Sequence, residues 1–203
     1  DVLDSFDTIV HNVANSYRLQ EECDLLGLKI SKHRGPVVLS EYKSTMLASL
    51  RALVPSWDAL HEVSWAWLWE NVERMLLTIV GKPRSMQASL EGFFTTLDEN
   101  CLMHVRCEVY KKFFVSAPQG QEYFKQSTTR LHFIADKAMS MTLDMYREPK
   151  RMVEDISAMG LRHVGYGIPT DLFGPFVTAF MEVVRSLAED AKAEEAFRWS
   201  LSL

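Results

Sequence analysis

The sequence has little of what marks several protein classes. Its three cysteines, Cys23, Cys101 and Cys107, show no zinc-binding or redox spacing, so we expect reduced thiols in a cytoplasmic protein. No apolar run approaches the length of a membrane span, and the first residues do not form a signal peptide. The net charge of -5 comes without any basic run, which argues against a nucleic-acid partner as well as a membrane.

Strand signals are also scarce, whereas helical periodicity runs along the chain. Glycine contributes only 9 of the 203 residues, and no alternating apolar pattern of useful length is present. Apolar residues make up 47% of the chain, which is enough for a sizeable core. They recur at helical spacing, as at Leu131, Ile134, Ala135 and Ala138. The sequence therefore predicts an all-α protein.

Proline, glycine and capping residues divide the chain into helices. A Trp-rich helix begins at the capping residues Ser56 and Asp58 and ends near Gly81. The stretch RGP at 34–36 turns the chain, and GKP at 81–83 separates two predicted domains. The other predicted helices span residues 2–17, 20–30, 39–53, 85–98, 99–116, 127–146, 150–163, 171–186 and 191 to the end.

Two parts of the chain resemble each other at an offset of 133 residues. Residues 19–36, LQEECDLLGLKISKHRGP, align without a gap on residues 152–169, MVEDISAMGLRHVGYGIP. With a slip of one residue, the helix that ends each part also aligns, and Trp67 then pairs with Trp199. The shared order of helix, break, helix and Trp-containing helix indicates a tandem repeat in a multi-domain chain.

His163, in the stretch GLRHVGYGIP, raises the question of a ligand site. An isolated histidine at the end of a helix is more often a capped polar residue than a metal ligand, so the residues before it decide. Tyr110 and Phe114 are four apart and share a helical face. Pro118 ends that helix, and Phe124 follows a short polar turn.

This order and spacing resemble the globin family, especially the globin domains of flavohaemoglobins and their single-domain relatives. The stretch LRHVGYGIP followed by TDLFGPF is similar to the globin histidine and the turn into the next helix. The resemblance covers residues 84–203 as a globin domain with helices A to H. Residues 1–83 then resemble a degenerate partial repeat of about four helices, from the distal helix to the last one.

The resemblance implies that His163 is the proximal, metal-binding ligand of the iron in haem b. Its second ring nitrogen would donate to a nearby acceptor. Phe124 matches the phenylalanine that packs on the porphyrin, and Tyr110 matches a distal tyrosine whose hydroxyl can donate to bound oxygen. The other positions that the resemblance places around the cofactor are Phe114, Ile134, Ala138, Phe173 and Phe176.

The distal helix departs from the family pattern. Counting from Phe124 without gaps places Ile134 at the gate, where the family usually has His or Gln. A shifted register would bring Leu131 or His132 there, and His132 would then be a candidate second axial ligand. That register also moves Asp136 onto the apolar face, which is unfavourable unless the carboxylate finds a partner.

The N-terminal copy differs from the C-terminal one at the ligand position. Ile30 stands where the second copy has His163, so we do not expect the first copy to hold haem iron from that side. His33, one helical turn later, could substitute only if the register slips. Helices at 85–124 complete either the second copy or, in a circularly permuted globin, the first. We prefer the second copy, because its aromatic residues then face His163.

We therefore expect a haem-binding globin that binds O2, NO or CO and is one unit of a longer multi-globin protein. Its partners would be other globin units or copies of itself, with the tryptophans of the Trp-rich helix at a contact. One alternative is a haem-free globin-fold module with a structural or interaction role, and another is a gas-sensor domain. Whether the chain is an enzyme stays open, because NO dioxygenase activity would need an external reductase.

Overall fold

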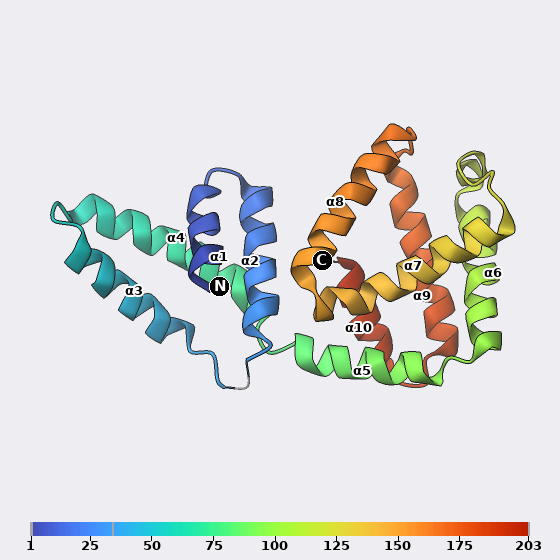
Figure 1. Ribbon diagram of the computed structural model, residues 1–203, viewed down its shortest axis with the longest axis horizontal. Helices are drawn as coiled ribbons and strands as arrows, with labels where there is room; N and C mark the ends of the chain where they lie inside the picture. The colour runs from blue at the N-terminus through green and yellow to red at the C-terminus, as the bar shows by residue number, and fades with distance from the viewer. Residues whose placement is uncertain (1, 34, 203) are drawn as a thin grey trace. The chain divides into compact units, whose positions relative to one another are not determined.

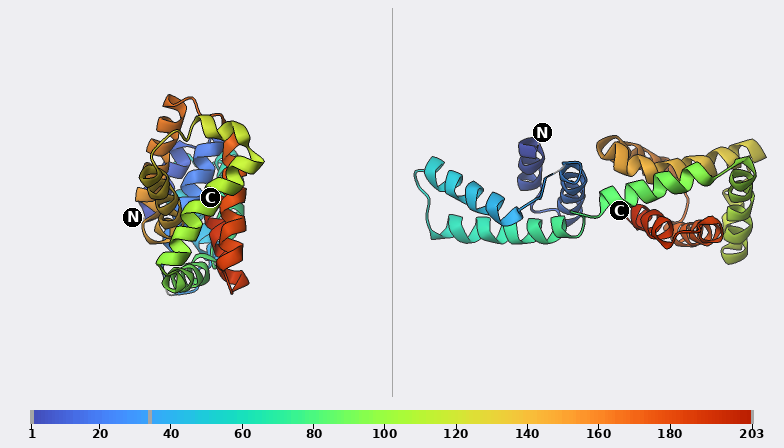
Figure 2. Two further views of the ribbon diagram at one scale, coloured as in Figure 1. Left: turned by 90° about the vertical axis from the view of Figure 1, so that its right-hand side faces the viewer. Right: turned by 90° about the horizontal axis from the view of Figure 1, so that it is seen from below.

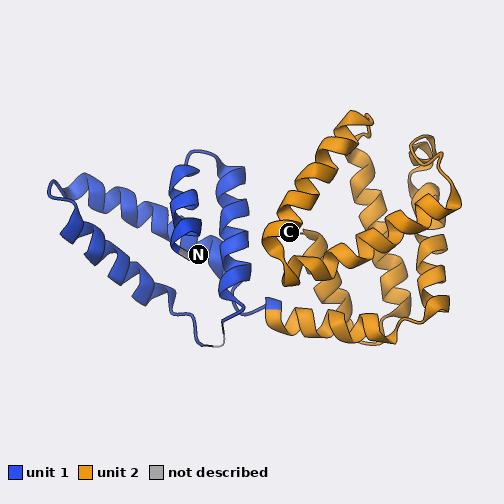
Figure 3. Cartoon of the chain, in the orientation of Figure 1, with its two compact units in different colours: residues 1–83 blue, residues 84–203 orange. Residues whose placement is uncertain are grey.

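The computed structural model describes residues 2–33 and 35–202. Within them the chain forms ten α-helices and two short 3-10 helices, with no strand, so the predicted all-α class is confirmed. The chain divides into two compact units, Asp1–Pro83 (unit 1) and Arg84–Leu203 (unit 2), shown in Figure 3. The division falls at the same residue as the predicted domain boundary.

The described residues of unit 1 form the helices α1 to α4, which Figure 1 labels. α1 (Val2–His11) and α2 (Ser16–Ile30) pack together, and α2 also packs on α4 (Ala59–Leu77). α3 (Leu39–Leu53) meets α4 at the turn that joins them, and the two helices spread apart from there (Figures 1 and 2). The core between these helices contains the buried residues Ile9, Leu19, Cys23, Leu26, Leu39, Leu68, Trp69, Val72 and Leu76.

The first helix is shorter than the sequence pattern predicts. α1 ends at His11, and the predicted end at residue 17 is wrong. The side chain of Asn15 accepts a hydrogen bond from the backbone N–H of Arg18 at 3.2 Å, which starts α2 at Ser16 instead of residue 20. Arg34 in the predicted turn, and residue 203 at the end of the predicted last helix, lie outside the described residues.

Unit 2 contains the remaining helices, and their bounds lie within a few residues of the predicted ones. α6 and α9 make its most extensive helix contact, and α7 packs on α6, α8 and α10. The α-helices are α5 (Pro83–Thr96), α6 (Glu99–Ser116), α7 (Thr128–Arg147), α8 (Pro149–Gly165), α9 (Phe173–Leu187) and α10 (Ala191–Ser202), and the 3-10 helices are η1 (Pro118–Glu122) and η2 (Thr170–Leu172).

Local side-chain chemistry sets the helix starts that position the candidate site. The carboxylate of Asp98 accepts a hydrogen bond from the backbone N–H of Cys101 at 2.8 Å and caps α6. Ser127 caps α7 in the same way, and Pro149 begins α8, where its fixed φ suits a first helical turn. None of the described helices combines the length and the apolar character that a membrane span requires.

Candidate functional site

The structure fixes the ring of His163 in the last turn of α8. Its Nδ1 lies 2.8 Å from the carbonyl oxygen of Met159, one turn earlier on the same helix. A carbonyl oxygen only accepts, so Nδ1 carries the proton and donates this bond. In the neutral ring, Nε2 then keeps its lone pair, which is the form in which imidazole binds a metal.

Most of α8 lies outside the core of unit 2. Its buried residues are Pro149 and Met152, in the first turn, where the helix leaves the end of α7. Figure 1 shows α8 diverging from α7 beyond this junction. Near His163, apolar side chains face solvent, with Leu161 75% exposed and Val164 76% exposed. The histidine therefore sits on a helix that presents apolar surface.

Phe173 is the predicted site residue that the structure places beside His163. The two ring centroids are 5.4 Å apart, and Phe173 is 41% exposed at the start of α9. This pair brings the end of α8 and the beginning of α9 together.

Other predicted site residues form a second aromatic group, in which Tyr110 is buried and the phenylalanines are half-buried. The ring centroid of Tyr110 lies 6.1 Å from Phe114, 5.5 Å from Phe124 and 6.3 Å from Phe176. Phe113, which the sequence pattern did not single out, packs edge-on against Phe124 and Phe176 at 5.6 and 5.5 Å. Its position next to Phe114 in the motif FF was the only signal that could have indicated it.

The Tyr110 hydroxyl is bonded within the protein. It donates to the backbone carbonyl oxygen of Leu131, in the first turn of α7, at 2.6 Å. Burial raises the pKa of Tyr110 well above its usual range, and the negative charge of Asp136 adds to this rise. The hydroxyl therefore keeps its proton and remains a hydrogen-bond donor.

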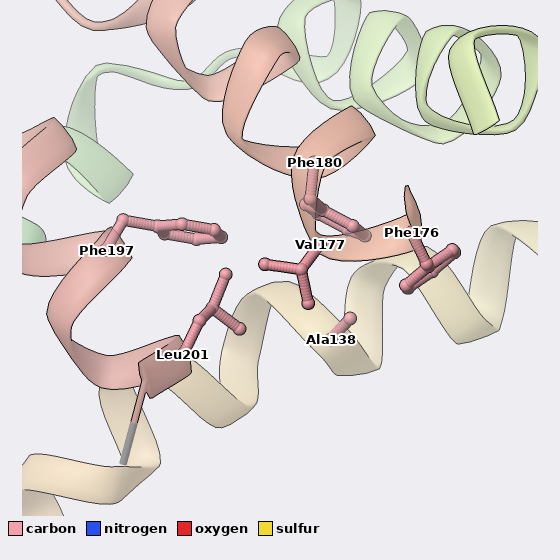
Figure 4. A pocket seen from close by; sticks show the side chains of 6 residues that line it. All are labelled: Ala138, Phe176, Val177, Phe180, Phe197 and Leu201. Carbon is pink, nitrogen blue, oxygen red and sulfur yellow. The ribbon is translucent and has the colours of Figure 1, made fainter. Parts of the chain in front are cut away.

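Ile134 and Ala138, predicted on the distal side, are half-buried on α7. Ala138 lines a small apolar pocket with residues from α9 and α10 (Figure 4). The pocket has a cavity volume of about 30 Å³, roughly the space of one water molecule, whereas cofactor pockets measure several hundred Å³. The other lining residues are Phe176, Val177, Phe180, Phe197 and Leu201.

The half-buried carboxylate of Asp136 on α7 forms an ion pair with Arg106. Its Oδ1 accepts a hydrogen bond from Nε of Arg106 on α6 at 2.8 Å. Nη1 of Arg106 also donates to Glu99 at 2.6 Å. The bridge joins α6 to α7 close to the Tyr110 bond. His132, the alternative ligand, is half-buried near the start of α7.

In unit 1, Ile30 is half-buried at the end of α2 and His33 is exposed. Trp69 packs against Tyr42 in the core, with ring centroids 5.2 Å apart, and its Nε1 has no hydrogen-bond partner among the described residues. Trp67 on the same helix is 54% exposed.

Among the described residues, no group of three or more His, Cys, Asp or Glu side chains is placed to hold a metal ion. The finding applies to metal ions that are bound by side chains alone. It does not apply to haem iron, which the porphyrin holds and which needs a single axial side chain from the protein. No family model, no curated protein and no solved structure matches the chain.

Proposed function

We propose that unit 2 is a haem-binding globin that binds a diatomic gas, with His163 as the axial ligand of the iron. The observation that carries the proposal is the fixed ring of His163, whose Nδ1 donates to Met159 and whose Nε2 keeps its lone pair. Metal-ligating histidines are oriented by this type of second hydrogen bond. When bound, ferrous haem b supplies a coordination position for O2, NO or CO.

Apolar side chains near the end of α8 are exposed, and the pocket of about 30 Å³ beside Ala138 is smaller than a porphyrin. Leu161 and Val164 are apolar and exposed, and Phe173 lies beside the imidazole. Apolar surface of this kind gains free energy when a hydrophobic ring covers it. Because haem bound to His163 would cover the exposed last turns of α8, we expect haem binding to slow amide hydrogen exchange there.

The test is a titration of the full chain with haem, followed by visible absorption with and without carbon monoxide. We expect a sharp Soret band that shifts with carbon monoxide. His163→Ala should abolish or strongly alter this spectrum. His104→Ala is the matched control, because His104 is exposed on α6 and should leave the spectrum unchanged. Identical spectra for wild type and His163→Ala would contradict the proposal.

The same titration decides the coordination of the iron. Bands of six-coordinate ferrous haem without added gas would indicate a second protein ligand, and His132→Ala should then restore a five-coordinate spectrum. His132 is half-buried in the first turns of α7.

A second candidate is a haem-free globin-fold module that contacts other globin units or copies of this chain. It is favoured by the small pocket of unit 2, by Ile30 at the ligand position of unit 1, and by the exposed ring of Trp67. A wild-type chain that binds no haem specifically, but self-associates in sedimentation experiments, would support this candidate.

A further inference from the structure

The outward face of α4 in unit 1 carries a regular stripe of side chains, which we call the α4 seam. Its members follow one another at alternating spacings of three and four residues: Leu60, Val63, Trp67, Glu70, Arg74 and Leu77. This is the heptad spacing of a coiled-coil seam, so the six side chains share one face of the helix. The four apolar members are each more than half exposed, and the two charged members are exposed as well.

The opposite face of α4 is the one that packs in the core of unit 1. Leu68, Trp69, Val72 and Leu76 are buried there, and α2 packs on α4. The helix therefore has two apolar faces, and the exposed fractions show that the other helices of unit 1 leave the α4 seam uncovered. Single exposed apolar residues are ordinary in proteins, whereas a continuous apolar stripe marks a contact surface.

The two charged residues of the seam determine what fits on it. Both side chains are exposed, and Nη2 of Arg74 donates to the neutral side chain of Asn71 at 2.9 Å. Along the helix, the second half of the seam is apolar, acidic, basic and apolar, at Trp67, Glu70, Arg74 and Leu77. The order of these four chemical types reads as apolar, basic, acidic and apolar in the reverse direction, so an antiparallel second copy is complementary to it in charge.

The register of that pairing follows from the positions of the charges. With a two-fold axis at the level of Val72, Glu70 faces Arg74 of the second copy, and Trp67 faces Leu77 of the second copy. Because the axis repeats each contact, both pairs occur twice. A parallel pair of helices would instead set Glu70 against Glu70 and Arg74 against Arg74, and like charges that face each other are unfavourable.

We propose that the α4 seam binds a second copy of the chain, as an antiparallel pair of α4 helices. Trp67 and Leu77 bury apolar surface across the axis, and the Glu70–Arg74 pairs fix the direction and the register. Leu60 and Val63 lie at the edge of this contact. The inference rests on the self-association given above as the second candidate function, for which it names the surface, and it holds whether or not the chain binds haem.

The test is sedimentation velocity of the full chain at concentrations from about 1 to 200 μM. A contact between two short helices is smaller than a standard protein interface, so we expect a dimer with a Kd of about 10–100 μM. Glu70→Arg and Arg74→Glu each place like charges opposite each other at both ends of the contact. Each variant alone should raise the Kd by about tenfold or more.

Two combinations of these changes should restore the dimer. The double variant Glu70→Arg/Arg74→Glu exchanges the signs and keeps opposite charges face to face, so its Kd should lie within about threefold of wild type. An equimolar mixture of the two single variants should form a heterodimer for the same reason. Glu41→Arg is the matched control, because it makes the same change of charge at an exposed position on α3 and should leave the Kd unchanged. Far-UV circular dichroism of each variant checks that the helices are retained.

The outcomes separate this inference from the functions proposed above. A chain that stays monomeric over the whole range would overturn both the inference and the second candidate function. Association that neither single variant weakens would refute the inference alone, because the copies would then meet through another surface. Failure of the double variant to recover would contradict the antiparallel register. The haem titration tests the haem site independently of all three.

Discussion

Replacing Gly120 by alanine tests the packing beneath the aromatic group of unit 2. Gly120 is buried in η1, and a Cβ atom there would lie 2.5 Å from Cζ and 2.6 Å from Cε1 of Phe113. Ordinary contacts begin at 3.4 Å, so the ring would have to move by roughly 1 Å. Phe113 is itself buried and packs edge-on against Phe124 and Phe176, which leaves it little room to move.

The expected loss of free energy of unfolding is that of overpacking a close-packed interior. Forcing one extra carbon into such a site destabilises proteins by about 1–3 kcal/mol. Gly92→Ala is the matched control, because Gly92 lies within α5, is exposed, and has nothing within 4 Å of its added Cβ. Alanine is a better helix former than glycine, so this control should stabilise unit 2 by about 0.5–1 kcal/mol.

The two variants are compared by urea denaturation of the full chain, followed by far-UV circular dichroism and by tryptophan fluorescence. Unit 1 holds four of the five tryptophans, at positions 57, 65, 67 and 69, so fluorescence reports mainly on unit 1. We expect Gly120→Ala to shift the dichroism transition of unit 2 to lower urea, with the fluorescence transition in place. A Gly120→Ala variant as stable as wild type would refute the packing described for Phe113.

Three further predictions concern other parts of the chain. The backbone N–H of His61 lowers the pKa of Asp58, so this N-cap should stabilise unit 1 above about pH 4 and lose its effect as the pH falls through the lowered pKa. Asp58→Asn still caps the helix but does not titrate, so the urea midpoint of its fluorescence transition should depend less on pH below about pH 5 than that of wild type. An equal pH dependence in the two proteins would contradict this. Burial raises the pKa of the Cys23 thiol to about 12, so a disulfide reagent at pH 8 should modify the half-exposed Cys107 first and Cys23 only when unit 1 unfolds. Peptide mass spectrometry of samples taken at successive times would show this order. Arg106→Met should lower the free energy of unfolding of unit 2 by about 1 kcal/mol, and by less in about 1 M salt, which screens the ion pairs of Arg106. An effect that does not depend on salt would mean that the packing of the side chain, and not its charge, joins α6 to α7.

The helices were predictable because their signals are local. Asp58, Asp98 and Ser127 each cap a helix by accepting a hydrogen bond from a backbone N–H three residues ahead, and the sequence shows such residues directly. The exception has the same cause, because Asn15 provides a cap that the apolar periodicity of residues 2–17 concealed. The predicted boundary at GKP depends on a similar local signal, a break of three residues.

Only part of the candidate site could be predicted from the sequence. The order of Tyr110, Phe114, Phe124 and Phe176 indicated an aromatic group, and these rings do lie together. The resemblance placed His163 and Phe173 around one cofactor, and the structure puts their ring centroids 5.4 Å apart. It gave no sign that the last turns of α8 would face solvent. Haem binding at His163 stays a prediction.

The sequence by itself determined the all-α class, nearly all helix bounds to within about four residues, and the residue types available for a site. These depend on periodicity and capping, which act within about four residues of the chain. Only the tertiary structure decided that the Tyr110 hydroxyl meets Leu131 and that Arg106 meets Asp136. The partners in these two bonds are 21 and 30 residues apart, so the packing of α6 on α7 selects them, and no local pattern encodes that choice.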